Sequence, residues 1–480
     1  MRISLSLIAI LLTSLTAFGA DYYAGSPKEA ELLFNKAAAG DRIFLKDGVY
    51  RDAEIQLFNP RGTKELPIRF AAQTPGKVYF EGNSTLRFAG THLIVSGFVW
   101  QNGGAGLGSN SVVEFRNGKN TASHCILENC VIDSYNTDTK ENTENKWVSL
   151  FGQYNTVTAC LFRNKINRGP TVTVWLESGK PAAHIISFNY FKIRGNAHDD
   201  SNGLESIRVG DSKTSFTEAH CVVAFNRFEE CDGEIEIISN KSCRNSYLYN
   251  TFYRNDGGLT LRHGNNCLVS GNAFYGGDKP LAYGVRIIGE GHTVINNLFY
   301  ALRGGENKGF RSALSILNGM ENSPLNGYFQ VRNASVAGNI FVNCAPPYVY
   351  AAFHSRPEAY LVPENIRLEK NLFYCDSGRR GPAYAELKAI KNLLSRDNYV
   401  VGLLLPEGTR GFASAKAKGI TRDGYQLSGL SEEITEKVYP RAAANENCGS
   451  AYISPSLASL LSDAKFCFLN AADVGPLWLR

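Results

Sequence analysis

The chain of 480 residues is 44% hydrophobic and 11% aromatic, which excludes an intrinsically disordered protein and allows a large core. Its formal charge is only +5 at pH 7, and its Lys and Arg residues form no dense stripe, so we expect no nucleic-acid partner. The mild positive charge is compatible with a basic groove for an acidic ligand, although an ordinary surface explains it better.

Residues 1–20 have the pattern of a signal peptide. Arg2 gives a positive start, residues 5–12 are an apolar run too short to span a bilayer, and residues 17–19 have the small-residue pattern that a signal peptidase needs. We therefore predict cleavage near residue 19 or 20 and an exported protein, periplasmic or extracellular. No Cys lies near this boundary and no later stretch approaches about 18 uninterrupted apolar residues, so we expect no membrane anchor.

A helix is predicted directly after this segment. Ser26-Pro27-Lys28-Glu29 matches a capping box with Pro at the first helical position, and residues 30–39 continue as an amphipathic helix. We expect this helix to cover the N-terminal end of the core, ahead of a strand at Arg42–Leu45.

One short pattern recurs through most of the chain: an apolar strand, then Asn, one further residue and Phe. The steps between its copies from position 226 to position 297 are 24, 22 and 25 residues. Such a period, made of short β-rich pieces, indicates a β-solenoid whose coils stack about 4.8 Å apart. Each Asn is then expected to bond to the Asn of the next coil, and each Phe to stack in an inner column. Seven strict copies argue against a chance strand ending: those at Asn189, Asn226, Asn250, Asn272, Asn297, Asn339 and Asn371.

The eleven cysteines follow the same repeat. In an exported protein one first considers disulfides. However, Cys221 and Cys267 each lie five residues before the Asn of their coil, a position that Asn245 and His292 occupy in other coils. We therefore predict buried, unpaired cysteines. A disulfide stays open only for the two cysteines beyond the repeat, Cys448 and Cys467.

The repeat fades after about residue 400. Residues 454–461 are expected to form a short helix, and the chain closes on an apolar segment at residues 474–478. We predict that residues 21–400 form the solenoid and that residues 401–480 are a C-terminal extension packed on it. The fold class is therefore all-β, a parallel β-helix with an N-terminal helical cap.

Two glutamates stand out within residues 202–263. Glu234 and Glu236 alternate with Ile235 and Ile237, so on a strand both carboxylates point to one face and the isoleucines point into the core. Two such charges repel unless a cation lies between them, and Ca²⁺ takes six to eight oxygen ligands. The alternative is a solvated strand face.

The spacing of three further residues shifts the balance toward a functional site. Lys241 follows the glutamates, and Arg262 lies 21 residues later, about one coil, so the two side chains can lie next to each other. Asn202 lies 32 residues before Glu234, which is consistent with the preceding coil. Carboxylates, an amide and two cations are thus expected to converge on one external groove.

This set of groups suits β-elimination of a uronate glycoside. The reaction removes a weakly acidic proton next to a carboxylate, and bound Ca²⁺ neutralises that carboxylate and stabilises the enolate-like intermediate. A lysine acts as the base in its neutral form, which neighbouring positive charge favours. A glycosidase would instead need a dedicated pair of carboxylic residues. The only nearby candidates have the loop setting of solvated turn residues: Asp199, Asp200 and Asp211.

Several motifs together resemble polysaccharide lyase family 6, which contains alginate lyases and chondroitinase B. The motifs are Asn-Gly-x-Glu-x-Ile-Arg-x-Gly at 202–210, Glu-x-Glu at 234–236, Lys-Ser at 241–242, Leu-Arg-His-Gly at 261–264, and the segments 284–289 and 311–319. The resemblance implies a right-handed parallel β-helix and calcium as the cofactor. It implies calcium ligands at Asn202, Glu234 and Glu236, a base at Lys241, an acid at Arg262, and grips on substrate carboxylates at His263, Arg286 and Arg311.

Some alternatives remain at this stage. His263 is equally well explained as a hydrogen-bonded ladder residue, and Arg208 and Glu205 are better explained as partners of each other than as substrate contacts. Leu204 stands where many relatives would have a small residue. The partner we expect is an anionic polysaccharide. Alginate is favoured over dermatan or chondroitin sulfate because most of the family acts on alginate, and a non-catalytic polysaccharide-binding β-helix is the second hypothesis.

Overall fold

The structure is a computed structural model that describes residues 19–106, 111–137, 144–196, 202–277, 279–307, 309–353, 356–405, 409–415 and 469–479. Most of the predicted signal peptide, the predicted helix at 454–461, and Cys448 and Cys467 lie outside the described residues.

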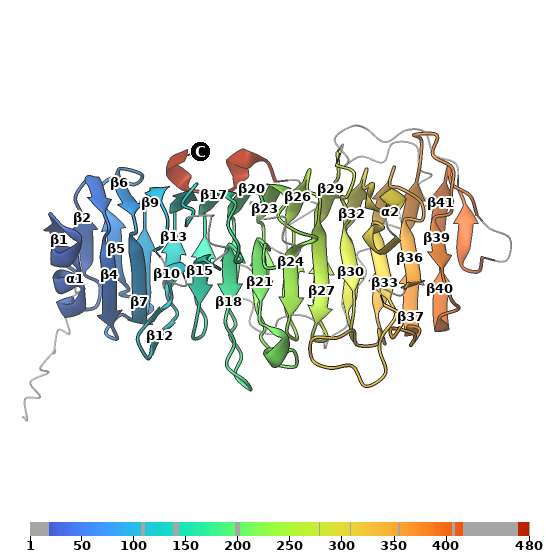
Figure 1. Ribbon diagram of the computed structural model, residues 1–480, viewed down its shortest axis with the longest axis horizontal. Coiled ribbons are helices and arrows are strands. Elements are labelled where there is room, and N and C mark those ends of the chain that lie inside the picture. The colour runs from blue at the N-terminus through green and yellow to red at the C-terminus, as the bar shows by residue number, and fades with distance from the viewer. Residues whose placement is uncertain are drawn as a thin grey trace, which may run out of the picture.

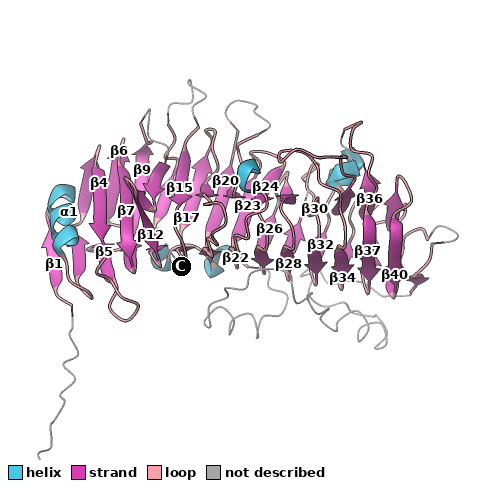
Figure 2. Ribbon diagram, turned by 90° about the horizontal axis from the view of Figure 1, so that it is seen from below, coloured by secondary structure: helices cyan, strands magenta, loops and turns pink. Residues whose placement is uncertain are grey.

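Three long sheets wind around one core, and each coil contributes a strand to the first, the third and then the second sheet (Figures 1 and 2). The described strands pair in parallel, apart from the antiparallel pair β11 and β12. The predicted parallel β-helix is therefore confirmed. None of the described helices is both long enough and apolar enough to cross a membrane.

The first sheet contains, in spatial order, β1 (Asp21–Ala24), β2 (Arg42–Leu45), β5 (Ile68–Ala72), β8 (Leu93–Ser96), β13 (Ile126–Glu128), β16 (Thr156–Thr158), β19 (Ile185–Ser187), β22 (Val222–Ala224), β25 (Ser246–Leu248), β28 (Leu268–Ser270), β31 (Thr293–Ile295), β34 (Ser335–Ala337), β37 (Glu364–Glu369) and β40 (Lys391–Arg396).

The second sheet contains β11 (Arg116–Asn117), β12 (Asn120–Ser123), β7 (Thr85–Thr91), β10 (Ser111–Glu114), β15 (Lys146–Leu150), β18 (Val172–Val174), β21 (Ile207–Val209), β24 (Glu236–Lys241), β27 (Gly258–His263), β30 (Val285–Ile287), β33 (Leu314–Leu317), β36 (Val349–Phe353) and β39 (Tyr384–Glu386), and β4 (Glu54–Asn59) pairs with β7.

The third sheet contains β3 (Gly48–Arg51), β6 (Val78–Gly82), β9 (Phe98–Gly103), β14 (Val131–Asp133), β17 (Leu161–Lys165), β20 (Tyr190–Arg194), β23 (Arg227–Cys231), β26 (Thr251–Tyr253), β29 (Ala273–Tyr275), β32 (Leu298–Tyr300), β35 (Ile340–Val342), β38 (Leu372–Tyr374), β41 (Asn398–Val401) and β42 (Phe412–Ser414).

The described helices are α1 (Pro27–Lys36) and α2 (Gly304–Asn307), with 3-10 turns η1 (Ser212–Thr214), η2 (Gly309–Arg311), η3 (Ala471–Asp473) and η4 (Leu477–Leu479).

The repeated Asn residues form a buried ladder at the corner between the first and third sheets. Asn250 shows the pattern, because its backbone N–H and its side-chain amide both donate to Oδ1 of Asn272, at 2.9 and 3.0 Å. Its own Oδ1 accepts two bonds from Asn226 in the preceding coil. Asn189, Asn297, Asn339, Asn371 and Asn398 continue the ladder. The predicted Asn-to-Asn contacts are confirmed, and they satisfy backbone groups that burial would otherwise leave without partners.

The Phe residues of the repeat form the predicted inner column. The rings of Phe228 and Phe252 stack with their centroids 4.9 Å apart, and Phe252 lies 4.4 Å from Phe274 in the same way. The nine described cysteines are all buried and form no disulfide with one another, as predicted. The core is therefore built from stacked identical positions rather than from cross-links.

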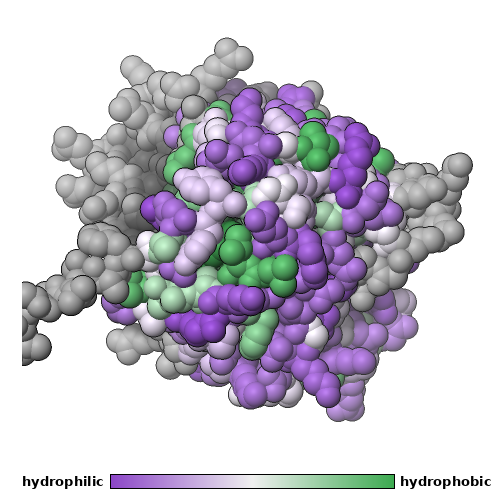
Figure 3. All heavy atoms as spheres, turned by 90° about the vertical axis from the view of Figure 1, so that its left-hand side faces the viewer, coloured by the Kyte–Doolittle hydropathy of each residue, from purple (hydrophilic) through white to green (hydrophobic). Residues whose placement is uncertain are grey.

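The N-terminal end is covered by α1, as predicted. Ser26 caps this helix by accepting a hydrogen bond from the backbone N–H of Glu29 at 3.2 Å, and Phe34 is fully buried. The helix ends at Lys36 rather than continuing to residue 39, because Ala37 takes a non-helical conformation. Viewed from this end, a mostly hydrophilic surface surrounds some hydrophobic side chains (Figure 3).

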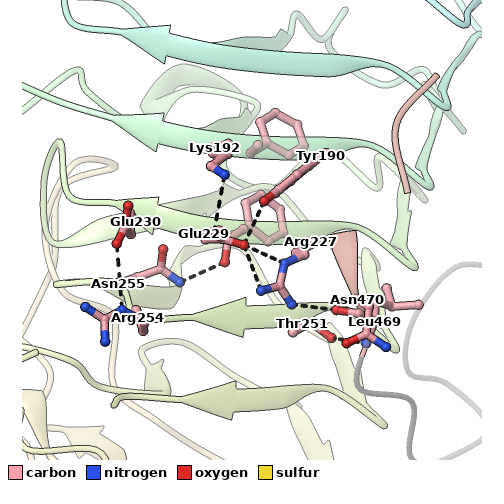
Figure 4. A network of polar contacts seen from close by, with 12 residues as sticks. Tyr190, Lys192, Arg227, Glu229, Glu230, Thr251, Arg254, Asn255, Leu469 and Asn470 are labelled. Carbon is pink, nitrogen blue, oxygen red and sulfur yellow. Dashed lines mark hydrogen bonds and ion pairs between the residues drawn. The ribbon is translucent and has the colours of Figure 1, made fainter. Parts of the chain in front are cut away.

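Residues 469–479 lie against the third sheet, beside residues more than 200 positions earlier in the chain. Arg227 of β23 donates to the carbonyl of Leu469 at 2.6 Å, and the N–H of Leu469 donates to Thr251 of β26 at 2.9 Å (Figure 4). At the other end of the segment, Trp478 donates through Nε1 to the carbonyl of Asn129 at 3.0 Å. The segment thus runs back along the β-helix, on the side of the third sheet (Figure 1).

Candidate active site

The candidate site lies on the outer face of the second sheet. On each strand a buried apolar residue such as Ile207 or Leu259 faces the core, so its neighbour in sequence faces outward. The outward neighbours form a row in register, which we call the central row. Most of the central row is polar and nevertheless buried. Its members include Ser149, Thr173, Arg208, Ser239, Thr260, Arg286 and Ser315.

The two predicted metal-binding glutamates are not simple alternating residues of one strand. Strand β24 begins at Glu236, so Glu234 and Ile235 precede it. The register skips Ile237 between Glu236 and Ile238, which marks a β-bulge. The expectation that both isoleucines point into the core is correct for Ile237, which is 2% exposed, but Ile235 is only partly buried. The bulge explains the difference, because an extra residue breaks the alternation of the strand.

Glu236 is held by two neighbours. Arg286 of β30 donates through Nη2 to its Oε1 at 2.8 Å, and Ser239 donates to its Oε2 at 2.5 Å. Arg286, which we expected to bind substrate, is only 6% exposed. Its guanidinium is already paired with the carboxylate of Glu236.

Lys241 lies at the end of β24 and approaches a buried acid from the preceding coil. Its Nζ is 3.8 Å from Oε1 of Glu205, which has no exposed surface. Neither carboxylate oxygen of Glu205 accepts a hydrogen bond from the described residues. The predicted pairing of Glu205 with Arg208 is wrong: Arg208 lies 3.8 Å from Glu144 instead.

A second irregularity aligns Lys241 with the next strand. The register between β24 and β27 shifts after Asn240, so that Lys241 pairs with His263 and lies beside Arg262. His263 is 2% exposed and its Nε2 lies 3.3 Å from the hydroxyl of Ser212. Burial lowers the pKa of His263 to about 3, and the charges of Arg262 and Lys241 act in the same direction. The imidazole is therefore neutral at pH 7.

Arg262 is held by a loop that comes from much later in the chain. Its Nη1 donates to the carbonyl of Gly327 at 2.6 Å and its Nη2 to the carbonyl of Asn326 at 3.0 Å. Its Cζ lies 4.3 Å from the ring centroid of Tyr328. Burial lowers the pKa of Arg262, and the charge of Glu236 opposes that change. The loop thus fixes the direction of the guanidinium.

Arg311, the remaining predicted substrate contact, binds the backbone. Its Nη1 donates to the carbonyls of Asp256 and Leu281 at 2.8 and 3.0 Å. Arg311 therefore joins two neighbouring coils.

The carboxylates near Lys241 suit a cation. Burial and the charges of Glu205 and Glu236 hold the pKa of Glu234 well above its usual range. Asn202 is exposed. Its segment lies in the preceding coil, where the backbone N–H of Ser206 donates to the carbonyl of Ile237 at 2.9 Å. Within the described ranges, no three His, Cys, Asp or Glu side chains are grouped closely enough to hold a metal. A calcium site here would need the amide oxygen of Asn202 besides the two glutamates.

Two contributions to the site were missed in the sequence. The sequence favours Arg208 as the partner of Glu205, although the place of Glu205 in the Asn-Gly-x-Glu motif also suggests a role beside the glutamates. Tyr328 and its neighbours contact Arg262 although they lie more than 60 positions later in the chain. No local sequence pattern predicts these contacts.

Comparisons with known proteins identify the family of the chain. The family model for chondroitinase B matches residues 25–417. The solved structure of the PL6 family alginate lyase AlyGC is 32% identical, with a TM-score of 0.83. A mannuronic acid specific polysaccharide family 6 lyase from human gut microbiota is 27% identical, with a TM-score of 0.75, and the match covers 92% of this chain and 98% of that one.

The match to AlyGC covers 96% of this chain but 59% of that chain, so this protein spans about three-fifths of AlyGC. The polysaccharide lyase Pedsa3628 from Pseudopedobacter saltans is 24% identical, covers 85% of this chain and 99% of its own, and has a TM-score of 0.67, which shows the shared fold. The comparison with curated proteins finds no match. Because the family model covers most of the chain, the protein belongs to the chondroitinase B family, polysaccharide lyase family 6.

Proposed function

We propose that this protein is a polysaccharide lyase that cleaves a uronate-containing polymer, with alginate as the first choice, by β-elimination. The observation that supports this most is the position of Lys241 beside Arg262 on neighbouring strands, next to the buried carboxylates of Glu205 and Glu236. Binding alone does not require a base, so this pair favours catalysis over a non-catalytic polysaccharide-binding β-helix.

In this proposal Lys241 is the base and Arg262 the acid. The neutral Nζ of Lys241 takes the proton from C5, next to the uronate carboxylate. The electron pair of that C–H bond forms the C4–C5 double bond, and the bond from C4 to the glycosidic oxygen breaks. The departing oxygen takes a proton from Arg262 or from water that Arg262 holds.

We propose that Asn202, Glu234 and Glu236 hold a calcium ion beside Lys241. Bound there, calcium supplies charge neutralisation for the substrate carboxylate. The donor set supports the choice of metal, because calcium prefers carboxylate and amide oxygens. His263, Arg286 and Arg311 were expected to grip substrate, but the hydrogen bonds of Arg286 and Arg311 favour a role in holding the site together.

Alginate is supported by two relatives, one described as an alginate lyase and one as specific for mannuronic acid. Dermatan or chondroitin sulfate is the alternative substrate, which the name of the matching family model supports.

The test is ultraviolet absorbance while the protein is mixed with alginate, and in parallel with dermatan sulfate. Elimination leaves a C4–C5 double bond conjugated to the carboxylate, which absorbs, whereas hydrolysis leaves none. We expect the absorbance to rise when the protein is mixed with alginate. A calcium chelator should stop this rise, and Lys241→Ala should show no rise. No rise on either polymer from folded, calcium-loaded protein would refute the proposal.

We also propose that the protein is exported after removal of residues 1–20, to the periplasm or beyond, and that residues 401–480 form an extension of a catalytic β-helix at residues 21–400. Mass spectrometry of the protein isolated from its host would test the first point. A start near residue 20 supports export, and an intact N-terminus argues against it.

A further inference from the structure

The loop that holds Arg262 is fixed at its base to the following coil. It runs from Gly319 to Gln330, between β33 and β34, and lies along the lower edge of the second sheet in Figure 1. The backbone N–H of Gly319 donates to the carbonyl of Leu361 at 2.8 Å, and the N–H of Leu361 returns the bond at 2.9 Å. Gln330 donates through Nε2 to the carbonyl of Val362 at 2.7 Å. The loop therefore has a firm base.

The same loop is also held from the opposite direction, by the segment around the 3-10 turn η1. This turn follows β21, so the loop reaches back past the strands that carry Arg262 and Lys241. The ring of Phe329 packs edge-on against the ring of Phe216, with the centroids 5.1 Å apart. The hydroxyl of Ser215, whose shorter bond goes to the carbonyl of Ser212 at 2.7 Å, also lies 3.3 Å from the carbonyl of Leu325.

The groups that bind Arg262 lie between these two contacts in the chain. The guanidinium donates to the carbonyls of Asn326 and Gly327, and it packs on the ring of Tyr328. These three consecutive residues are flanked on both sides by the residues that contact the segment around η1. The part of the loop that orients Arg262 is thus fixed through a segment that precedes Arg262 by more than 40 positions.

The turn η1 is itself well fixed. Oδ1 of Asp211 accepts hydrogen bonds from the backbone N–H groups of Lys213 and Thr214, at 2.9 and 3.0 Å, and so caps the turn. The hydroxyl of Ser212 lies 3.3 Å from Nε2 of His263, the residue that follows Arg262. The turn is therefore an anchor that contacts both the strand of Arg262 and the loop.

Phe216 is 51% exposed, so its burial stabilises the fold less than that of a ring in the inner column. We propose that Phe216 is a positioning residue for the acid of the reaction: it latches Phe329 and so keeps the loop where its carbonyls orient Arg262. The inference rests on the proposed function for the role of Arg262. Without the latch the loop opens more often, and the guanidinium loses the fixed direction that proton transfer to the departing oxygen requires.

The test compares Phe216→Ala with Phe216→Tyr in absorbance kinetics on alginate. Phe216→Ala should lower kcat about tenfold and leave KM unchanged, because the latch acts on the acid and not on substrate binding. Phe216→Tyr keeps the ring and should retain most of the activity. Phe58→Ala is the matched control, because Phe58 is 39% exposed and lies on β4, near the N-terminal end of the β-helix. It should change neither constant.

A double variant tests whether the latch acts through Arg262. Tyr328→Ala already removes a contact that orients the guanidinium, so adding Phe216→Ala should lower kcat little further. Fully multiplicative losses would show that the two rings act independently and would overturn the positioning role. An equal loss of kcat in Phe216→Tyr and Phe216→Ala would also overturn it.

Hydrogen exchange measured by mass spectrometry separates the latch from the reaction. In Phe216→Ala the amides of residues 319–330 should exchange faster than in the wild-type protein, with little change in Tm, and in Phe58→Ala they should not. Equal exchange in Phe216→Ala, or a large drop in its Tm, would overturn the latch even if the wild-type protein cleaves alginate. Faster exchange with unchanged kcat would overturn the positioning role. Faster exchange, when the wild-type protein cleaves no uronate polymer, would keep the latch and refute the lyase.

Discussion

The side-chain nitrogen of Lys241 lies 3.8 Å from Oε1 of Glu205, an acid with no exposed surface and no hydrogen-bond donor among the described residues. A buried carboxylate in such surroundings lowers the stability of the fold unless it has a partner. Glu205 is therefore better explained by its effect on Lys241 than by a contribution to folding.

Glu205→Gln should separate activity from stability. We expect kcat to fall at least tenfold, because Lys241 loses the charge that orients it, with little change in KM. The free energy of unfolding of the metal-free protein should stay equal or rise, because the variant no longer buries a carboxylate whose oxygens accept no hydrogen bond from the described residues. Absorbance kinetics and urea unfolding measure the two effects. An unchanged kcat, or a large loss of stability, would contradict this role.

The ring of Tyr328 is predicted to position Arg262. Tyr328→Ala removes a cation–π contact worth about 0.5–2 kcal/mol, so kcat should fall several-fold to tenfold. Tyr328→Phe keeps the ring and should retain most of the activity. If the two variants are equally impaired, the hydroxyl and not the ring is the important group.

Calcium should stabilise the folded protein as well as support activity. A ligand that binds only the folded state adds about 2.7 kcal/mol at a hundred times its Kd, so a chelator should lower Tm. Glu234→Gln should abolish most of this calcium-dependent shift, because it removes one of the proposed ligands. A shift of the same size in Glu234→Gln would place the ion elsewhere.

Buried histidines predict a loss of stability in acid. Nδ1 of His292 accepts the backbone N–H of Cys267 at 3.2 Å, and burial lowers the pKa of His292 to about 4. Between that value and the unfolded value of about 6.5 the unfolded chain binds more protons, so this contribution to stability is complete above pH 6.5 and falls as the pH drops toward 4.

His292→Asn should reduce that acid sensitivity. Two coils earlier, Asn245 accepts the N–H of Cys221 at 2.9 Å in the same position, so Asn can replace the imidazole without titrating. Urea unfolding at pH 7 and pH 4 should show a loss smaller than in the wild-type protein by on the order of 3 kcal/mol. His92→Asn, at a coil corner, is the control. Equal losses in all three proteins would show that folding does not lower the pKa of His292.

The fold could be predicted from the sequence because the residues that determine it recur in each coil. Each Asn of the ladder bonds to the Asn of the next coil, so a single periodic signal specifies both the coil length and the corner. The strand Arg42–Leu45 was also predicted correctly. The end of α1 was not, because residues 37–39 have helix-compatible side chains although Ala37 takes a non-helical backbone conformation.

The site could be predicted only in part, because a register shift and a β-bulge determine where its side chains lie. The alignment of Lys241 with His263 depends on a register shift, and the position of Glu234 ahead of β24 depends on a bulge. The pairing of Arg286 with Glu236 joins residues 50 positions apart. Spacing in the sequence brings coils together, but it does not specify bulges or which acid each cation contacts.

The central claim is that the glycosidic bond is broken by elimination at Lys241, and the isotopic composition of the products tests it most directly. Alginate digested in water labelled with heavy oxygen should give oligomers that carry no label at the cleaved bond and are lighter by one water than hydrolysis products. Lys241→Ala should give none of these products. Label incorporated at the new ends, or undiminished cleavage by Lys241→Ala, would contradict the account.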